Sequence, residues 1–334
     1  MKILGIETSC DETAAAVVED GTKILSNVIA SQTEFHEKYG GVVPEIASRK
    51  HLELLDSVID EALNKADTRL EDLSAVAVTI GPGLVGALLI GLASAKALSY
   101  VLEIPLIGIN HLEAHLSAGF IEHPQVRPPL VSLIVSGGHT ILALMDKDMK
   151  TEVLGSTLDD AAGEAFDKIA RYLELGYPGG PVIDTLAKEG DEKAIAFPRA
   201  MMDKKTYDFS LSGLKTAVIN YMKNAKKEGR EPDVKDVAAA FQAAIVDVQV
   251  AKTVKAACEK GVKTILLAGG VAANSSLKKK MAEKASEYII DVFYPSSELC
   301  TDNGAMIAAL AFKYYDKGPY LDLNANVNEN LFLA

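Results

Sequence analysis

Two histidines at a helical spacing are the side chains of this sequence best suited to chemistry. His111 and His115 lie four positions apart, so on a helix their rings share one face and can bind the same metal ion. The chain holds 6 histidines in all, so a third protein ligand is expected to be a distant carboxylate oxygen, and Asp302 is the candidate. The spacing by itself is also met by two solvated histidines on a half-exposed helix.

The same spacing argues against a zinc peptidase. In that motif, His-Glu-x-x-His, a glutamate directly follows the first histidine and acts as general base. Here Glu113 comes two positions after His111, and at about 100° per residue its side chain points away from both rings. The pattern therefore predicts a metal site without protease activity.

The composition predicts an ordered protein of the cytoplasm. With 334 residues, of which 49% are hydrophobic and 24% charged, the chain is long enough for two domains. Its cysteines, Cys10, Cys258 and Cys300, are odd in number and widely scattered, which fits a reducing compartment better than a disulfide framework. The N-terminus reaches an acid at Glu7, so it lacks the apolar core of a signal peptide.

One uncharged segment, residues 73–95, is long enough to cross a bilayer. A Gly-Pro-Gly turn at 81–83 interrupts it, which predicts a buried strand over 74–80 followed by a helix over 84–102. We therefore expect this segment to form core and the protein not to enter a membrane.

The net charge of −12 argues against a generic binder of polyanions, because nucleic-acid affinity depends on cations that neutralise phosphates. Local basic clusters in the second half still offer a nucleic-acid surface, although on the charge pattern alone solvated helix faces are the better explanation. These clusters are Lys204 and Lys205, then Lys223, Lys226, Lys227 and Arg230, and finally Lys278 to Lys280.

The order of predicted elements indicates a duplication. Each half contains a strand hairpin with a polar turn, a third strand, and later a strand, a glycine turn and a helix. In the first half the predicted strands are 3–8, 13–19, 23–30, 74–80 and 105–109, with helices at 44–64 and 84–102. In the second half they are 129–135, 140–145, 152–155, 263–267 and 291–294, with helices at 161–173, 237–259, 275–286 and from about 302.

This duplication predicts two domains of α/β class. The first half spans 1–128 and is joined by a C-terminal helix over 302–334, whereas the second half spans 129–301. An insertion at about 176–236 has no counterpart in the first half. It begins with Pro/Gly turns that end at Asp184, which suit a loop that pins a ligand hydroxyl, although an ordinary linker is the alternative.

The two halves together suggest a nucleotide site. Polar hairpin turns can grip phosphates through backbone N–H groups, and glycine turns let a nucleotide lie close to the backbone. The expected phosphate turns are Glu7 to Thr13 and Ser136 to Thr140, and the expected nucleoside turn is Ala268 to Asn274.

Other nucleotide motifs fit less well. Gly81, Gly83 and Gly86 form a G-x-G-x-x-G between a strand and a helix, but the next strand ends at Asn110 rather than at an acid that could hold a ribose. The phosphate loop G-x-x-x-x-G-K-[ST] does not occur in the sequence.

Seven motifs follow one another along the whole chain. They are GIETSCDET at 5–13, GGVVPEIASRKH at 40–51, NHLEAH at 110–115, VSGGHT at 135–140, GGPVID at 179–184, AGGVAAN at 268–274 and TDNG at 301–304. Together and in this order they resemble the TsaD family of tRNA adenosine threonylcarbamoyltransferases, and the turn at Gly176 is similar to that of the bacterial branch.

The resemblance implies a duplicated actin/Hsp70/sugar-kinase (ASKHA) fold with two RNase H-like halves. It also implies one divalent metal ion, usually iron, with zinc or magnesium as alternatives, held by His111, His115 and Asp302. The implied ligand is threonylcarbamoyl-adenylate, contacted by Ile134, Val135, Ser136, Gly137, Gly138, Asp167, Gly180, Asp184 and Asn274. Ser9, Asp11 and Glu12 belong to the expected phosphate turn of the first half.

The implied reaction needs no covalent intermediate. In tRNAs that read codons starting with A, the exocyclic amine of the adenosine 3′ of the anticodon attacks the activated carbonyl of the mixed anhydride, and AMP leaves. A metal Lewis acid and backbone donors would stabilise the developing charge. No side chain stands out as general base, and Cys10 is better explained as part of a backbone cradle than as a nucleophile. The implied partners are tRNA, a TsaB-like paralogue and a TsaE-like ATPase.

Two other functions share this fold class. A phosphotransferase or ATPase would use the same phosphate turns, but it needs a carboxylate base near an acceptor hydroxyl and has no use for the histidine pair. A nucleotide-gated interaction module similar to Hsp70 would be expected to carry a peptide-binding domain after the fold, and this sequence ends at Ala334. Metal content would separate the transferase from both.

Overall fold

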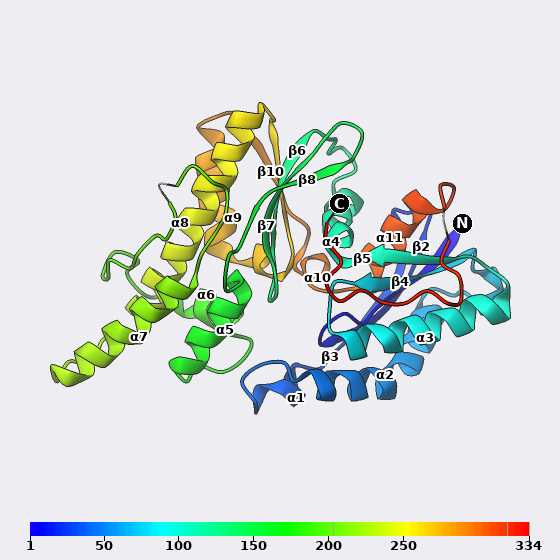
Figure 1. Ribbon diagram of the computed structural model, residues 1–334, viewed down its shortest axis with the longest axis horizontal. Helices are drawn as coiled ribbons and strands as arrows, with labels where there is room; N and C mark the ends of the chain where they lie inside the picture. Colours follow the sequence, from blue (N-terminus) through cyan, green and yellow to red (C-terminus); the bar gives the residue numbers. More distant parts are fainter. Residues whose placement is uncertain (203, 319, 334) are drawn as a thin grey trace. The chain divides into compact units, whose positions relative to one another are not determined.

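The computed structural model describes residues 1–202, 204–318 and 320–333, and these form two compact units. Unit 1 comprises residues 1–125 and 295–333, and unit 2 comprises residues 126–294 (Figure 1). The sequence predicts the same two divisions at 128/129 and 301/302. Each unit is built on one mixed five-stranded sheet.

Unit 1 has the strand order β3-β2-β1-β4-β5, in which β1 pairs antiparallel with β2 and parallel with β4. Its strands are β1 (Lys2–Glu7), β2 (Glu12–Glu19), β3 (Lys23–Ser31), β4 (Ala75–Gly81) and β5 (Leu106–Asn110). Its helices are α1 (Thr33–Glu37), α2 (Pro44–Lys65), α3 (Val85–Leu102), α4 (His111–Glu122), α10 (Ser297–Cys300) and α11 (Gly304–Tyr314), with a 3-10 turn η1 (Leu70–Asp72).

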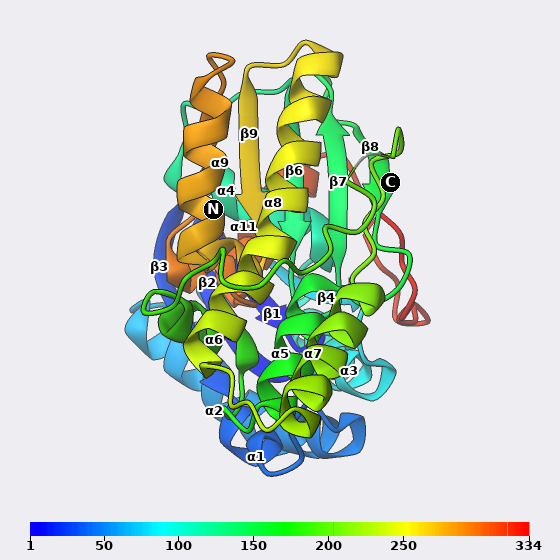
Figure 2. The ribbon, with the colours of Figure 1, turned by 90° about the vertical axis from the view of Figure 1, so that its left-hand side faces the viewer.

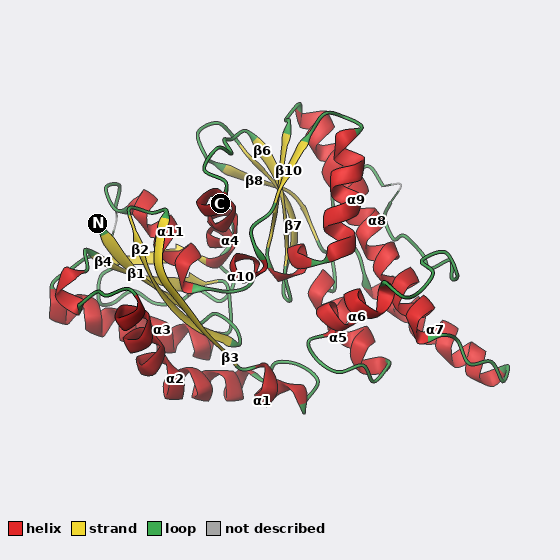
Figure 3. Ribbon diagram, turned by 180° about the vertical axis from the view of Figure 1, so that it is seen from behind, coloured by secondary structure: helices red, strands yellow, loops and turns green. Residues whose placement is uncertain are grey.

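Successive side chains of a strand point to opposite faces of the sheet, and helices cover both faces of this one. On one face Leu4 and Ile6 pack with α2 and α3, and on the other Ile3 packs with α4 and α11 (Figure 3). Three consecutive alanines, 14–16, leave little bulk on β2, so α11 can lie close to the sheet. Burial on both faces explains the nearly unbroken apolar strands.

Unit 2 repeats the topology of unit 1 with the order β10-β9-β6-β7-β8. Its strands are β6 (Leu130–Val135), β7 (Thr140–Met145), β8 (Thr151–Ser156), β9 (Thr264–Ala268) and β10 (Asp291–Phe293). Its helices are α5 (Ala162–Tyr172), α6 (Gly179–Ala187), α7 (Ser212–Lys227), α8 (Val234–Lys260) and α9 (Ser275–Ser286), with a 3-10 turn η2 (Gly270–Ala273). Helices α8 and α9 lie side by side on one face of the sheet (Figure 2).

The pairings confirm the predicted duplication strand by strand. As β1 does in unit 1, β6 pairs antiparallel with the next strand of its hairpin, β7, and parallel with a later strand, β9. The outer pairs match as well, since β2–β3 and β7–β8 are antiparallel whereas β4–β5 and β9–β10 are parallel.

The insertion holds more helix than the sequence analysis predicts. The stretch expected to be a Pro/Gly loop forms α6, because Pro181 falls in the first turn, where a missing N–H costs nothing. A carboxylate oxygen of Asp167 accepts a hydrogen bond from Gly179 N at 2.7 Å and so caps that turn from outside the helix. Most of the insertion's remaining helix is α7.

The C-terminal helix is shorter than the predicted 302–334, of which positions 319 and 334 lie outside the described residues. Helix α11 ends at Tyr314, and the chain then runs along unit 1 without a further helix or strand among the described residues. Leu321 N donates to Leu106 O and Asn328 N donates to Ile80 O, both at 2.8 Å, so this segment is tied to the ends of β5 and β4.

Two helices, α3 and α8, are long and apolar enough to cross a membrane by length and composition alone. The apolar window of α8 is 89% buried inside the structure, as expected of a core helix, whereas that of α3 is 28% buried. This criterion is weak evidence of a membrane span, because core helices also meet it.

Candidate functional site

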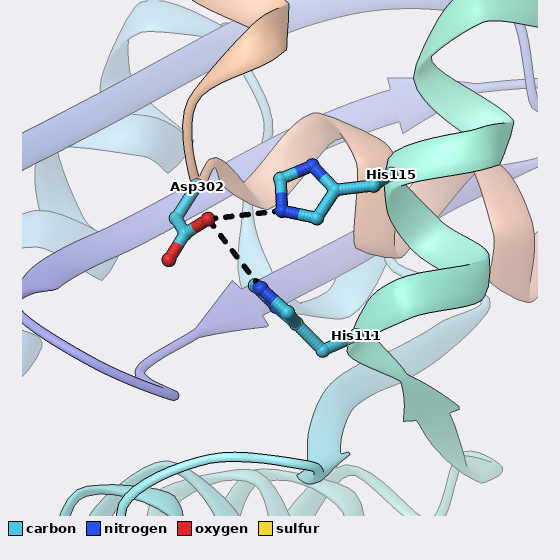
Figure 4. Close-up of side chains that lie close together, drawn as sticks. All are labelled: His111, His115 and Asp302. Carbon is cyan, nitrogen blue, oxygen red and sulfur yellow. Dashed lines mark ion pairs between the residues drawn. The ribbon is translucent and has the colours of Figure 1, made fainter. Parts of the chain in front are cut away.

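The histidine pair lies at the carboxyl edge of the unit 1 sheet. His111 is the first residue of α4 and directly follows β5, so the end of this strand fixes where the helix begins. The Asn110 side chain caps the helix by accepting a hydrogen bond from Leu112 N at 2.9 Å. The predicted helical spacing is confirmed, and both rings project from the same face of α4 (Figure 4).

Asp302 reaches this edge because α11 starts very close to β1. A Cβ added to Gly5 would lie 2.3 Å from Gly304 O, so only glycine permits this approach of strand and helix. Asn303 caps α11 by accepting a hydrogen bond from Met306 N at 3.0 Å, which fixes the backbone next to Asp302. Two glycines and one cap thus bring a carboxylate to a histidine pair that is remote in sequence.

The three side chains converge on one point. Asp302 Oδ1 lies 3.1 Å from His115 Nε2 and 3.4 Å from His111 Nε2, so that one carboxylate oxygen faces both rings (Figure 4). The ring centroids are 4.6 Å apart and the rings are nearly perpendicular, at 80°. The potential ligand atoms all lie within 4.8 Å of one another.

This donor set fits a divalent metal ion. Ligands at about 2.1 Å in a tetrahedral arrangement are separated by about 3.4 Å, close to the distances observed. His115 Nε2 is buried and, although Asp302 Oδ1 lies 3.1 Å away, it makes no hydrogen bond to a described residue, which is costly unless something else binds this nitrogen. Two imidazoles and one carboxylate suit iron or zinc better than magnesium, which prefers oxygen ligands.

The charges around His111 favour its protonated form when no metal is bound. Burial of the ring acts to lower its pKa, but the carboxylates of Asp302 and Glu7 outweigh this effect and raise the pKa of His111 to about 9. Burial also acts to raise the pKa of Glu7, but the charge of His111 outweighs burial and lowers the pKa of Glu7 below its ordinary value. Metal binding therefore has to release the His111 proton.

The first polar turn, residues 9–12, lies beside this cluster and is held by the protein itself. Ser9 N donates to a Glu7 carboxylate oxygen, and Ser9 O accepts from Leu84 N at 2.8 Å. Asp11 is buried, and burial together with the charges of Asp11 and Asp302 raises the pKa of Glu12 well above its ordinary value. The N–H of Ser9 is thus already used.

Cys10 is a poor nucleophile in this setting. Burial, together with the negative charges of Asp11 and Asp302, raises the pKa of its thiol well above the ordinary value, so the reactive thiolate is disfavoured. The carbonyl of Cys10 instead faces His51 Nε2 at 3.0 Å. The turn is consistent with a structural role for this cysteine.

The second polar turn, residues 136–139, lies in unit 2 and is open. A Cβ added to Gly137 or Gly138 would meet nothing within 4 Å. The carbonyls of Ser136 and Gly137 accept from Gly163 N and Glu164 N at the start of α5, both at 3.1 Å. No hydrogen bond from the N–H of Gly137 or Gly138 to another described residue is found, so these donors are available to a ligand.

The other predicted residues of unit 2 already have structural contacts. Asn274 caps α9 by accepting from Leu277 N at 2.9 Å, and Asp184 accepts from Ser275 Oγ at 2.8 Å. Gly180 lies in the first turn of α6, next to the bond between Asp167 and Gly179 N, with open space where a side chain would be. Ile134 and Val135 have buried side chains, so only their backbone can face a ligand.

Two residues that organise the unit 1 site, Glu7 and His51, are not predicted from the sequence as site residues, although Glu7 starts the expected phosphate turn. Glu7 is fully buried and bonds to His111, whereas His51 bonds to the carbonyl of Cys10 and to Thr13 Oγ1. Glu7 could have been found from the sequence because it is an acid at the end of an otherwise apolar strand. For His51 the sequence gives no indication of a site role other than its position in the motif at 40–51.

Two exclusions made from the sequence agree with the geometry. Glu113 Oε2 accepts from Tyr314 OH at 2.9 Å, so this carboxylate faces α11 rather than the histidine rings. The glycines of the G-x-G-x-x-G run serve packing, because a Cβ on Gly83 would lie 2.6 Å from Ser9 O and one on Gly86 would lie 2.4 Å from Ser48 Oγ.

Comparisons with known sequences point to one family. The family model of TsaD, described as tRNA N6-adenosine threonylcarbamoyltransferase, matches residues 23–309. A protein of that name from Clostridioides difficile (strain 630) is 54% identical over 328 residues, 98% of this chain and 97% of the relative. One from Caldicellulosiruptor saccharolyticus is 53% identical over 326 residues, 98% of this chain and 96% of the relative.

Comparisons with solved structures concern the fold alone. Component A of (R)-2-hydroxyglutaryl-CoA dehydratase from Acidaminococcus fermentans matches with a TM-score of 0.58 at 16% identity, covering 95% of this chain and 100% of that chain. HypF from T. kodakarensis matches with a TM-score of 0.61 at 15% identity, covering 94% of this chain and 48% of that chain. With the duplicated sheets, these neighbours confirm the predicted actin/Hsp70/sugar-kinase fold.

Proposed function

Because the chain belongs to the TsaD family and is a tRNA N6-adenosine threonylcarbamoyltransferase, we propose that its donor substrate is threonylcarbamoyl-adenylate. The acceptor is the exocyclic amine of the adenosine 3′ of the anticodon in tRNAs that read codons starting with A, and AMP is released. The convergence of His111, His115 and Asp302 carries this proposal, since a phosphotransferase of the same fold has no use for such a cluster.

The proposed cofactor is one divalent metal ion held by His111, His115 and Asp302. Iron is the first choice, because two imidazoles and one carboxylate with open positions suit Fe2+, and zinc is the alternative. When bound, the metal supplies a Lewis acid that polarises a substrate oxygen. The buried Nε2 of His115, which faces Asp302 and has no hydrogen bond to a described residue, supports this assignment.

The adenylate is assigned to unit 2. The free N–H groups of Gly137 and Gly138 suit a phosphate or a developing oxyanion, and the open first turn of α6 at Gly180 suits a ribose. Asp184 and Asn274 line the start of α9, where a nucleoside would contact Asp184. Ile134 and Val135 end the strand that leads into this turn, the backbone of Ser136 fixes the turn through its bonds to His139 and Gly163, and Asp167 supports the position of α6.

The reaction requires the protein to orient the amine and the activated carbonyl, and it does not require a covalent intermediate. The carbonyl of a mixed anhydride is already activated, so the amine nitrogen can attack it directly while the bond to the phosphate oxygen of AMP breaks. Donors at Gly137 and Gly138 can offset charge on that phosphate or on the carbonyl oxygen. The raised pKa of the Cys10 thiol also argues against an acyl-cysteine intermediate.

The proposed protein partners are a TsaB-like paralogue and a TsaE-like ATPase, with the cytoplasm as location. The outer face of α3 supports a protein partner, because large apolar side chains are exposed along it: Val85, Leu89, Tyr100 and Val101. A paralogue with the same fold could cover this face with its own corresponding helix. Among the described residues, the structure offers no comparable indication for the ATPase.

The experiment is incubation with threonylcarbamoyl-adenylate and unmodified tRNA, with and without the two partner proteins. We expect threonylcarbamoyladenosine in the tRNA and an equal amount of AMP. A parallel reaction with ATP in place of the adenylate tests the phosphotransferase alternative. Phosphorylated product from ATP, with no modified adenosine from the adenylate, would contradict the proposal.

A further inference from the structure

Glu7 is a carboxylate with no exposure to solvent, at the end of β1. Burying a charged carboxylate is costly unless hydrogen bonds replace its water. Glu7 accepts from Ser9 N through Oε1, and through Oε2 it accepts from Thr79 Oγ1 at 2.6 Å and contacts His111 Nδ1 at 3.0 Å. Donors from three separate segments therefore satisfy this one side chain.

The contact with His111 determines which ring nitrogen can bind a metal. A carboxylate accepts hydrogen bonds, so Nδ1 of His111 must carry the proton that it donates to Glu7. The neutral ring then has its lone pair on Nε2, and Nε2 is the atom that faces Asp302 Oδ1 at 3.4 Å. Ser9 Oγ lies 3.2 Å from the same Nδ1 and adds a second acceptor on that side.

We propose that Glu7 is a positioning residue that fixes His111 in its metal-binding tautomer and joins the metal site to the first polar turn. The inference rests on the proposed metal site, to which it adds an outer residue. Carboxylates behind metal-bound imidazoles orient the ring and strengthen it as a ligand. Through Ser9 N, the same carboxylate also sets the turn that begins beside it.

The assignment is specific to one of the two histidines. His115 Nδ1 is buried and has no hydrogen-bond partner among the described residues, so no carboxylate supports that ring. In unit 2 the position that corresponds to Glu7 is Val135, since each residue ends the first strand of its hairpin. The carboxylate thus occurs only in the repeat that carries the histidine pair.

The test is metal affinity, measured by titration of the chelated full-length protein with Co2+ and followed by visible absorption. Glu7→Gln should weaken Co2+ binding by about 10- to 100-fold, the usual cost of losing a residue that hydrogen-bonds a metal-bound imidazole. It should also alter the visible absorption band of the bound Co2+. The matched control is Glu113→Gln, which removes another carboxylate near α4, one bonded to Tyr314 instead of to a histidine. This control should bind Co2+ like the wild type.

A second variant guards against misfolding of Glu7→Gln. Thr79→Val keeps the carboxylate but removes one of its hydrogen bonds, and it should weaken Co2+ binding by about two- to tenfold. If both variants fold and bind Co2+ as tightly as the wild type, the role of Glu7 is wrong. If instead the wild type and His111→Ala with His115→Ala bind Co2+ equally, the metal site itself is wrong.

Discussion

The two polar turns of the duplicated fold offer opposite chemistry on the same scaffold. In unit 1 the strand before the turn ends in buried Glu7, which accepts a hydrogen bond from Ser9 N. Two further acids, Asp11 and Glu12, follow between the paired residues of the hairpin. In unit 2 the equivalent strand ends in buried Val135, and the N–H groups of the following glycines have no partner among the described residues. The first turn places acidic side chains beside the histidine pair that suits a cation, whereas the second presents N–H donors and suits an anion.

This difference shows how one topology acquires two roles without a change in strand order. The turn between the last paired residues runs from 8 to 13 in unit 1 and from 136 to 139 in unit 2, so the first turn is longer and has room for acids. The helix after β5 then supplies imidazoles, whereas the segment that follows β10, residues 294–300, contains no histidine. Five measurements can break or sharpen this division.

The largest effect is expected from removing the imidazoles of unit 1. His111→Ala with His115→Ala should abolish stoichiometric metal after mild chelation, because a lone Asp302 cannot hold a metal against a chelator. Elemental analysis of the purified protein measures this loss. His123→Ala, at the end of the same helix, is the control and should keep its metal. Full metal content in the double variant would place the metal elsewhere.

Substitutions at two glycines test whether unit 1 needs glycine for close packing and unit 2 needs it for ligand binding. Gly5→Ala puts a methyl group against Gly304 O and should destabilise the protein by roughly 1–3 kcal/mol in denaturant unfolding. Gly137→Ala meets no protein atom, so it should leave stability unchanged while weakening adenylate binding at least tenfold. Unchanged adenylate affinity in a folded Gly137→Ala protein would remove this turn from the nucleotide site.

The sequence predicts the strands well because apolar alternation and glycine turns are local signals. It predicts α6 poorly, since a Gly-Gly-Pro start looks like a loop until Asp167 supplies the missing cap. For the site, the histidine pair is visible from its spacing. The partner of His111 is not visible, because the buried bond joins Glu7 at the end of β1 to the start of α4 and leaves no periodic trace in the sequence.

A smaller effect concerns tRNA, which a chain of net charge −12 must bind through local cations. Lys223, Lys226 and Lys227 are exposed near the end of α7 in unit 2. Replacing all three lysines by Glu should reduce the slope of log tRNA affinity against log salt concentration by up to about 2 units. Adenylate binding should not change.

The control for tRNA binding carries the same change in net charge at exposed lysines elsewhere. Lys38, Lys147 and Lys317 serve this purpose. Filter binding over a range of salt concentrations measures both variants. Equal slopes in the two would move the tRNA surface away from α7.

The smallest effect is expected at Asp159, which ties the insertion to the loop after β8. Burial opposes its ionisation, but hydrogen bonds from Ser210, Leu211 and Ser212 outweigh it and lower the pKa of Asp159 to about 2. The folded pKa lies below the unfolded one, so this stabilisation is present above about pH 4 and is lost as the pH falls through 2.

Asp159→Asn should therefore unfold more easily than the wild type at pH 7, by about 1 kcal/mol after allowance for solvent screening. The difference should shrink between pH 4 and pH 2, whereas metal content should not change. Denaturant titrations at several pH values measure it, with exposed Asp60→Asn as control. A difference that is constant with pH would mean that the charge of Asp159 contributes nothing.

The most direct test of the division between the two turns is to measure metal and AMP binding in the same two variants. AMP carries the phosphate, ribose and base that are assigned to unit 2, and calorimetry reports its affinity. The account predicts that His111→Ala with His115→Ala loses the metal and still binds AMP, and that Gly137→Ala keeps the metal and loses AMP affinity. Loss of both ligands in either folded variant would contradict it.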